Sequence, residues 1–469
     1  MTDDVPRRER SPGIKLLFAG LVGLALMIPL MLVYALVYDR QDQSNTAQAA
    51  INAGWGGEQV VAGPVLVVPY RTTEIQTETV EGRQVSKAVD VERELYVSPL
   101  SNRAEARIVP QERRKSIYRS VLFEARLKGK ARFGLPADLP RFGVRPEQLI
   151  WDRAELRIGA SDARGLMHGG AITAGGRPLA VEPGNGPAAT GGQGFFAFVP
   201  WDGEGTLEVG YEFGLRGSRS LSLVPRGGRT EWKVASSWPS PSFSGAFLPD
   251  AREISDGGFS ASYVVDKLAL GQPPVATRDL GPPVVNAGTA ASYRPVIAPD
   301  GAASGSALAV SVGLVEPVDL YSKVDRSVKY GFLFIGFTFV TFLLFDVIGG
   351  ARVAPAEYLL TGAGLVLFFV LLLAFAEVIG FTGAYLVASA AIVGLLTAYS
   401  AAVLGGWRRA GFVGALLAGL YATLFVLLNL EALSLLIGAV LLFLALAGIM
   451  YVTRNVEWNR VGRREEADG

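Results

Sequence analysis

The stretch LLFAGLVGLALMIPLMLVYALVY, from Leu16 to Tyr38, is 23 residues long and contains no charged side chain. An α-helix of that length reaches about 34 Å and can cross a hydrocarbon core of about 30 Å. The apolar region of a cleaved signal peptide is shorter, and the nearest A-x-A pattern, residues 47–49, lies well beyond it. We therefore predict an uncleaved transmembrane anchor at residues 16–38, after a cytoplasmic tail at residues 1–15.

Apolar runs of similar length return in the C-terminal third of the chain. They are separated by short segments, which favour antiparallel neighbours. We expect a five-helix transmembrane bundle at residues 328–453 and a cytoplasmic tail at residues 454–469. The five expected spans are Tyr330–Ile348, Tyr358–Ala376, Phe381–Leu404, Ala410–Leu430 and Ala432–Thr453.

Basic residues beside the spans predict the orientation of the chain. The two tails and the loops that contain Arg352 and Arg408 are basic, whereas the loops near Glu377 and Glu431 have no Lys or Arg. With six spans, all the basic segments fall on one side of the membrane. This pattern places both termini in the cytoplasm and the long segment between the first two spans outside.

The outside segment, residues 39–327, has a sequence pattern typical of β-structure. Short apolar and aromatic runs alternate with Gly, Pro, Asn and Asp, and the apolar residues of LEVGYEF (207–213) share one face of a strand. We predict a large all-β, sandwich-like domain. Helices are expected at Gln41–Asn52 and Leu320–Tyr330, and a Pro-rich loop at Leu270–Ala290.

The composition argues against most catalytic classes. The 469 residues carry a net charge of +1, contain no Cys and contain a single His, His168, between glycines. Thiol chemistry and disulfides are therefore excluded, and a Ser-His-Asp site would have to use His168. The Gly-rich segment Glu182–Phe196 precedes a strand-like run and lacks G-K-[ST], which favours turns over a phosphate loop. We expect no enzyme activity, cofactor, metal or nucleic-acid partner.

Residues Arg103 to Arg132 hold ten Lys or Arg. Four of these cations, at positions 126, 128, 130 and 132, lie two residues apart and share one face of a strand. Two interpretations stay open. The stretch is either a solvated strand face or a surface for anionic headgroups and other envelope polyanions.

The segment SSWPSPSFSGAFLPD, Ser236–Asp250, combines aromatic side chains with Ser and Pro. Its serines have no His nearby in the sequence to act as a base, and its prolines favour extended chain. Trp238, Phe243 and Phe247 form either an aromatic cap on the β core or an exposed docking surface. Docking is the functional hypothesis for these three residues.

Glu377 lies in LLLAFAEVIGFT, at the outer boundary of the third expected span. Ionisable groups inside a membrane are costly and tend to be functional, although a group near the interface can reach water. Asp346 and Glu431 are also close to span ends, and no span has a charge near its centre. This distribution argues against a proton relay and leaves Glu377 as a candidate polar site in the membrane.

These stretches resemble the CreD family of bacterial inner-membrane proteins. The resemblance runs almost the whole length and includes IPLMLVYALVYDR, VVAGPVLVVPY, ASDARGL, EPGNGPAATGGQGFF, the Ser236–Asp250 segment and TRNVEW. It implies a protein of cell-envelope integrity, controlled by the CreBC two-component system, whose levels alter tolerance of colicins and envelope-active agents. The family has no established catalytic residue, substrate or cofactor to carry over.

Two functional hypotheses follow from the residues and the resemblance. The first is a non-enzymatic protein of envelope stress and colicin or antimicrobial tolerance, which sits in the lipid bilayer and docks an unidentified periplasmic or envelope partner. The second is transport or lipid handling by the helical bundle, with the β domain as a cap and Glu377 as its polar contact. A periplasmic hydrolase built on His168 is disfavoured.

Overall fold

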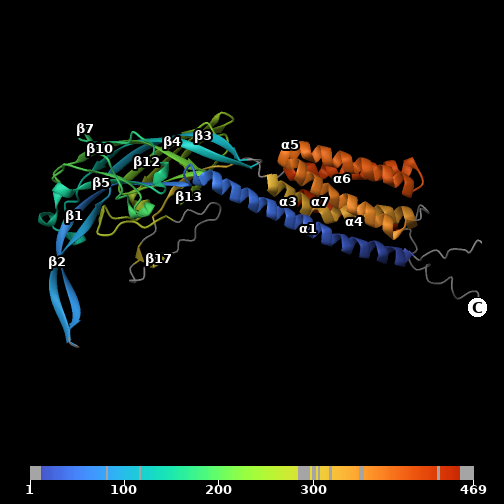
Figure 1. Ribbon diagram of the computed structural model, residues 1–469, viewed down its shortest axis with the longest axis horizontal. Helices are drawn as coiled ribbons and strands as arrows, with labels where there is room; N and C mark the ends of the chain where they lie inside the picture. The colour runs from blue at the N-terminus through green and yellow to red at the C-terminus, as the bar shows by residue number, and fades with distance from the viewer. Residues whose placement is uncertain are drawn as a thin grey trace, which may run out of the picture. The chain divides into compact units, whose positions relative to one another are not determined.

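The computed structural model describes residues 12–80, 83–115, 118–283, 296–297, 303–304, 307–315, 320–347, 353–429 and 434–454. Glu431, Arg352, most of both tails and the end of the Pro-rich loop lie outside these residues. Packing divides the chain into two compact units. One is Met1–Asn45 with Val318–Gly469, and the other is Thr46–Pro317. The first unit is helical and the second is built mainly of strands (Figure 1).

The helical unit contains one long helix from the N-terminal part of the chain, whose last residues from Thr46 belong to the β unit, and a group of helices from the C-terminal part. These are α1 (Pro12–Ala53), α3 (Leu320–Lys329), α4 (Gly331–Val347), α5 (Pro355–Val403), α6 (Trp407–Asn429) and α7 (Ser434–Thr453). Among the described residues, four helices are long and apolar enough to cross a membrane: Lys15–Asn52, Leu320–Asp346, Pro355–Val403 and Trp407–Asn429. Helix α1 continues through the predicted stalk, and α3 matches the predicted helix that leads into the second span.

Helix α5 contains a break at Gly380. The backbone there has φ 78° and ψ 164°, outside the helical region and accessible in practice only to glycine. The predicted spans Tyr358–Ala376 and Phe381–Leu404 lie on opposite sides of this break. The 49-residue helix is therefore made of two helical segments that meet at Gly380.

Aromatic side chains fill the centre of the helical unit. The ring of Phe368 meets those of Phe369, Tyr385 and Tyr421 edge to face, with centroid distances of 5.0, 5.5 and 4.5 Å. The hydroxyl of Tyr385 donates a hydrogen bond of 2.7 Å to the backbone oxygen of Tyr421. These contacts pack α5 against α6 and leave little space for water at the centre.

The β unit contains two large sheets. Across the first lie β13 (Pro241–Gly245), β19 (Val310–Leu314), β11 (Ser220–Val224), β1 (Gln59–Val80), β5 (Glu155–Ala160), β9 (Gly194–Phe198) and β8 (Glu182–Pro183). In the same sheet, β2 (Arg83–Val97) pairs with β1, and β16 (Val275–Ala276) pairs with β2. Beyond the sheet, β1 and β2 continue as a two-stranded ribbon (Figure 1).

Across the second sheet lie β14 (Ala251–Ser255), β15 (Gly258–Asp266), β12 (Arg229–Ser236), β3 (Ser101–Lys115), β4 (Tyr118–Phe133), β10 (Leu207–Ser218), β6 (Ala171–Ala174) and β7 (Arg177–Leu179). A small separate pair is formed by β17 (Val296–Ile297) and β18 (Ala303–Ser304). The connections include α2 (Lys267–Leu270) and five 3-10 turns at Leu139–Phe142, Pro146–Gln148, Trp151–Arg153, Ala163–Gly165 and Ala188–Thr190.

Alternating side chains give the β unit its core. In β10 the apolar residues 207, 209, 211 and 213 are buried, whereas Glu208 and Glu212 are exposed, as the alternation predicts. Buried residues from both large sheets, including Leu66 of β1 and Phe123 of β4, belong to one hydrophobic cluster. The outward faces of the strands remain available for charged side chains, and the second sheet carries many of them.

Candidate functional site

The strands that connect the β unit to the helical unit lie close together in the first sheet. Strand β1 begins at Gln59, six residues after the end of α1 at Ala53, and β19 is the last strand before α3. Leu221 of β11 lies between them, paired with Gln59 on one side and Val312 of β19 on the other. The start of β1 and the end of β19 therefore lie at the same end of the sheet, about 10 Å apart by strand spacing. We call this end the junction.

Trp55 holds the incoming chain at the junction. The central guanidinium carbons of Arg113 and Arg216 lie over its ring, 4.3 and 4.5 Å from the centroid. Its indole nitrogen donates a 3.4 Å hydrogen bond to the backbone oxygen of Phe123. Two cation–π contacts on one ring fasten the segment after α1 to β3 and β10. Sequence reasoning missed this role, although a Trp directly after a membrane helix was a visible signal.

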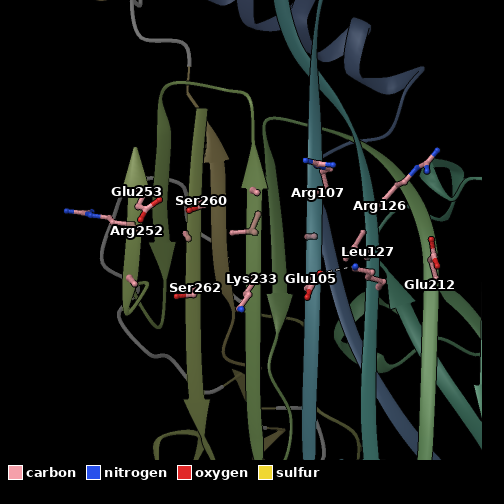
Figure 2. Close-up of a pocket in the computed structure, with 16 residues that line it drawn as sticks. Glu105, Arg107, Arg126, Leu127, Glu212, Lys233, Arg252, Glu253, Ser260 and Ser262 are labelled. Carbon is pink, nitrogen blue, oxygen red and sulfur yellow. Dashed lines mark ion pairs between the residues drawn. The ribbon is translucent and has the colours of Figure 1, made fainter. Parts of the chain in front are cut away.

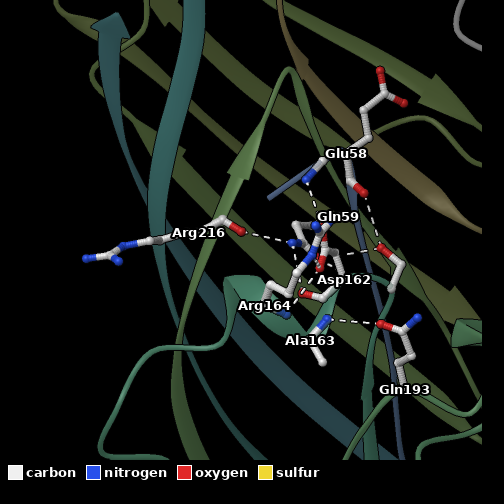
Figure 3. A network of polar contacts seen from close by, with 9 residues as sticks. Glu58, Gln59, Asp162, Ala163, Arg164, Gln193 and Arg216 are labelled. Carbon is white, nitrogen blue, oxygen red and sulfur yellow. Dashed lines mark hydrogen bonds and ion pairs between the residues drawn. The ribbon is translucent and has the colours of Figure 1, made fainter. Parts of the chain in front are cut away.

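Gln59, which is fully buried, lies at the centre of a polar network at the start of β1 (Figure 3). Its amide nitrogen donates to the backbone oxygens of Arg216, at 2.9 Å, and Asp162, at 3.3 Å. A side chain at Gly56 would lie 2.9 Å from the Arg216 oxygen, so this close approach requires glycine. The network joins the start of β1 to the ASDARGL loop.

The ASDARGL loop is held in turn by its own ion pair. The Arg164 guanidinium lies 2.8 Å from the Asp162 carboxylate. The hydrogen bond from Arg164 lowers the pKa of Asp162 below its usual value. Partial burial of the carboxyl group acts in the opposite direction, and hydrogen bonds from backbone N–H groups add to the lowering. The loop is therefore a fixed structural element beside the junction.

The Ser236–Asp250 segment fastens the outgoing chain. Its strand β13 pairs antiparallel with β19, and Phe243 lies opposite Val312. The indole nitrogen of Trp238 donates a 2.9 Å hydrogen bond to the backbone oxygen of Val315, the last described residue before α3. The segment thus holds the strand that leads back to the helical unit by both backbone and side-chain bonds.

Trp238, Phe243 and Phe247 are each half-buried and pack against the β core. Phe243 meets Phe259 edge to face at 5.8 Å. These contacts account for the three rings structurally, while each keeps part of its surface in solvent. Their role in docking stays a prediction. His168 lies exposed in a separate loop.

Glu377 is half-buried near the break in α5. Its carboxylate accepts a 3.1 Å hydrogen bond from the hydroxyl of Tyr321 in α3. Lys323, on the same helix as Tyr321, reaches Asn429 of α6 at 3.2 Å and lies 5.4 Å from the ring of Phe381. Polar contacts thus join α3 to α5 at Glu377, three residues before Gly380, and join α3 to α6 at Asn429.

A buried ion pair joins the segment after β11 to the Pro-rich loop. Arg226, after β11, pairs with Asp279 of the Pro-rich loop, and both side chains are almost fully buried. The other oxygen of Asp279 accepts a 2.6 Å hydrogen bond from the backbone nitrogen of Ala188, in the Gly-rich segment. The Gly-rich segment is a set of turns held by this contact. Within the described residues, no group of three or more His, Asp or Glu could hold a metal ion.

The sequence is similar to known proteins along both units. A family model described as "Inner membrane protein CreD" matches residues 11–459. The chain is also 32% identical over 445 residues to "Inner membrane protein CreD" of Escherichia coli (strain K12), covering 93% of this chain and 91% of that protein. The match includes α1, the β unit, both sides of the junction and the C-terminal helices. The chain belongs to the CreD family of inner membrane proteins.

Proposed function

We propose that this protein is a non-enzymatic member of the CreD family that contributes to cell-envelope integrity and to tolerance of colicins and other envelope stress. In this proposal the β unit docks an envelope partner, and the helical unit anchors it in the bilayer. The observation that carries the proposal is the junction. Trp55 and Trp238 fasten the incoming and outgoing chain at one end of the first sheet, where β1 and β19 lie about 10 Å apart.

Fastening at two neighbouring points suits a domain that must hold a partner at a membrane. Because both chain connections leave the β unit at one end of its first sheet, the rest of its surface is not occupied by connecting chain. The remaining edges and faces of the β unit stay available for contacts. The family match supports a role in the inner membrane but assigns no chemistry to it.

We also infer that the chain crosses the membrane six times, with both termini in the cytoplasm and a sandwich-like β unit in the periplasm. The break at Gly380 supports counting α5 as two spans, and α7 is a 20-residue apolar helix. The basic flanks described above support the orientation. Reporter fusions at residues 1, 40, 380 and 469 would test this topology, because a periplasmic reporter at either terminus would contradict it.

The docking proposal is tested by complementation in a strain that lacks the gene. Sensitivity to a detergent and a colicin is measured after restoring Trp238→Ala with Phe243→Ala, or Glu377→Gln, at matched membrane abundance. Phe198→Ala serves as the control, because Phe198 is an exposed aromatic residue of β9 outside the segment. We expect the aromatic double variant to fail and the other two to complement.

Trp238→Phe separates two roles of this residue. It keeps an aromatic ring and removes the hydrogen bond to Val315. Failure of Trp238→Phe together with the double variant indicates that fastening the outgoing strand is essential. If only Glu377→Gln fails, the helical unit performs the function and the docking proposal is wrong.

Transport or lipid handling is the second candidate function. The observation that favours it is the position of Glu377 beside the broken helix α5, with the Tyr321 hydroxyl on its carboxylate. Interrupted membrane helices often form the binding sites of transporters. This candidate predicts that Glu377→Gln and Gly380→Ala both abolish complementation, whereas Thr382→Ala, at an exposed position on α5, does not.

A further inference from the structure

The outward face of the second sheet carries charges in rows that run across the strands. In one row, cross-strand register places Glu212, Lys128, Glu105 and Lys233 side by side on β10, β4, β3 and β12. The signs alternate along this row, and Lys128 lies 3.1 Å from Glu105. Each charge in the row therefore has an opposite charge next to it, which is the usual arrangement on a solvated sheet.

The neighbouring row breaks this pattern. Arg107 of β3 lies directly opposite Arg126 of β4, and the next positions outward are Ala235 and Gly214. Figure 2 shows the two arginines at the same level on adjacent strands. Within the part of the chain that the structure describes, neither arginine makes an ion pair. Like charges directly opposite each other destabilise a sheet, and neither position that flanks this arginine pair along its row, Ala235 or Gly214, carries a carboxylate.

A groove begins beside these arginines. Its volume is about 700 Å³, and the short side chain of Ala235 lies at its floor between Arg107 and Ser260. Glu253 of β14 is opposite Ser260 and forms the far wall (Figure 2). Strand spacing puts about 10 Å between the backbones that carry Arg107 and Ser260. The groove therefore has a cationic wall, a low floor and a wall of hydroxyl and carboxylate groups.

We propose that this groove binds a phosphorylated saccharide of the cell envelope, with the phosphate on Arg107 and Arg126 and the sugar hydroxyls on Ser260 and Glu253. Paired guanidinium groups suit a phosphate, because each presents several donors in a planar fork. Carboxylate and hydroxyl groups accept and donate hydrogen bonds to a sugar. The inference names the partner class of the docking function proposed above and rests on it.

The groove is lined by charges of both signs: the carboxylates Glu105, Glu212 and Glu253, and the cations Arg107, Arg126, Lys128, Lys233 and Arg252. Lys128 and Glu105 form an ion pair with each other, whereas Arg107 and Arg126 face each other across two strands. A ligand with one anionic end and one hydroxyl-rich end suits this arrangement, because its phosphate can face the two arginines while Glu253 faces hydroxyl groups.

The test uses the full chain in a polyoxyethylene detergent, which has neither sugar nor phosphate. Calorimetry measures binding of glucose 1-phosphate, glucose and inorganic phosphate. We expect glucose 1-phosphate to bind at least tenfold more tightly than either of the other two. Arg107→Gln with Arg126→Gln should weaken its binding at least tenfold, and Glu253→Gln should weaken glucose 1-phosphate but leave inorganic phosphate unchanged.

Arg103→Gln with Lys130→Gln is the matched control. It removes two charges from the same two strands, at another directly opposed pair, and Arg103 already has a carboxylate partner in Glu231 at 3.2 Å. Equal losses in the two double variants would mean that only net charge matters and would overturn the site. Equal binding of glucose 1-phosphate and inorganic phosphate, or no binding of either, would also overturn it.

The result of the binding test does not depend on whether the docking function proposed above is correct. The binding measurement uses purified protein and does not depend on a phenotype. If Arg107→Gln with Arg126→Gln loses binding but complements the deletion fully, the site stands and the docking function is wrong. If it keeps binding and fails to complement, the saccharide proposal is wrong and docking uses another surface.

Discussion

Lys15 at the start of α1 and Asp346 at the end of α4 form an ion pair of 2.8 Å, although 331 positions separate them in the sequence. The Asp346 side chain is 1% exposed and the Lys15 side chain 25%. A carboxylate so well buried requires a cation, because a charge without a partner is costly in an apolar environment. The pair therefore joins the N-terminal anchor helix to the C-terminal helices within one unit.

Asp346→Asn should destabilise the helical unit by about 3 kcal/mol, the lower end of the range for breaking a buried pair, because Lys15 reaches some solvent. Thermal aggregation of the purified full chain measures the effect. Lys15→Met with Asp346→Leu should recover most of the loss, since neither charge is then left alone. A double variant as unstable as Asp346→Asn would show that the pair does not act through its charges.

Arg226→Met should destabilise the β unit by about 3 kcal/mol or more, because it leaves Asp279 buried without its cation. Denaturant unfolding followed by Trp fluorescence measures this change. The control is Arg153→Met, which breaks an exposed ion pair with Glu92 and should cost less than about 1 kcal/mol. Similar losses for the two variants would contradict the importance of the buried pair.

The β unit should become less stable as the pH decreases in the acid range, and Glu94 is one cause of this loss. Burial raises the pKa of Glu94, but hydrogen bonds from Arg157, at 2.6 Å, and from Tyr96 outweigh burial and hold it below its usual value of 4.5. A carboxyl with a lowered pKa in the folded state stabilises the fold above its unfolded pKa, and this contribution disappears as the pH falls through the folded value.

Glu94→Gln should therefore make the loss of stability below about pH 4.5 less steep. Melting temperatures of the two proteins between pH 3 and 7, followed by Trp fluorescence, measure the slope. An unchanged slope in the variant would exclude Glu94 as a source of acid sensitivity.

Arg107→Glu should stabilise the β unit, because it replaces a like-charge pair with an opposite-charge pair across β3 and β4. Such pairs contribute about 0.2–1 kcal/mol, which corresponds to a rise in melting temperature of about 2 °C. Arg107→Gln should give a smaller rise. A lower melting temperature for Arg107→Glu would indicate that the arginine pair is held by contacts other than those described above.

Much of the helical unit could be predicted because a membrane imposes a local rule. Each span must be apolar over about 20 residues, so α1 and the segments on both sides of Gly380 could be located without knowing their neighbours. Alternation in LEVGYEF likewise placed the inward face of β10. The sequence predicted only that one span ends at Ala376 and the next begins at Phe381. It did not predict that the backbone leaves the helical region at Gly380.

The candidate sites depended on long-range pairing that the sequence pattern did not contain. The basic stretch was recognised, but only strand register revealed that Arg107 faces Arg126 while Lys128 faces Glu105. The Ser236–Asp250 segment was recognised as aromatic, but its pairing with β19 and the bond from Trp238 to Val315 became visible only in the fold.

The sequence by itself indicated which segments are long apolar helices, which regions are rich in strands and which strand faces are apolar, because these properties follow from periodicity within about 20 residues. The tertiary structure decided which charges meet. Lys15 finds Asp346, Arg226 finds Asp279 and Arg107 meets Arg126 because helix packing and strand register bring distant residues to the same place. The periodicity of side chains reports which face of a single helix or strand is apolar. Which charged residues become partners depends on how helices and strands pack against one another.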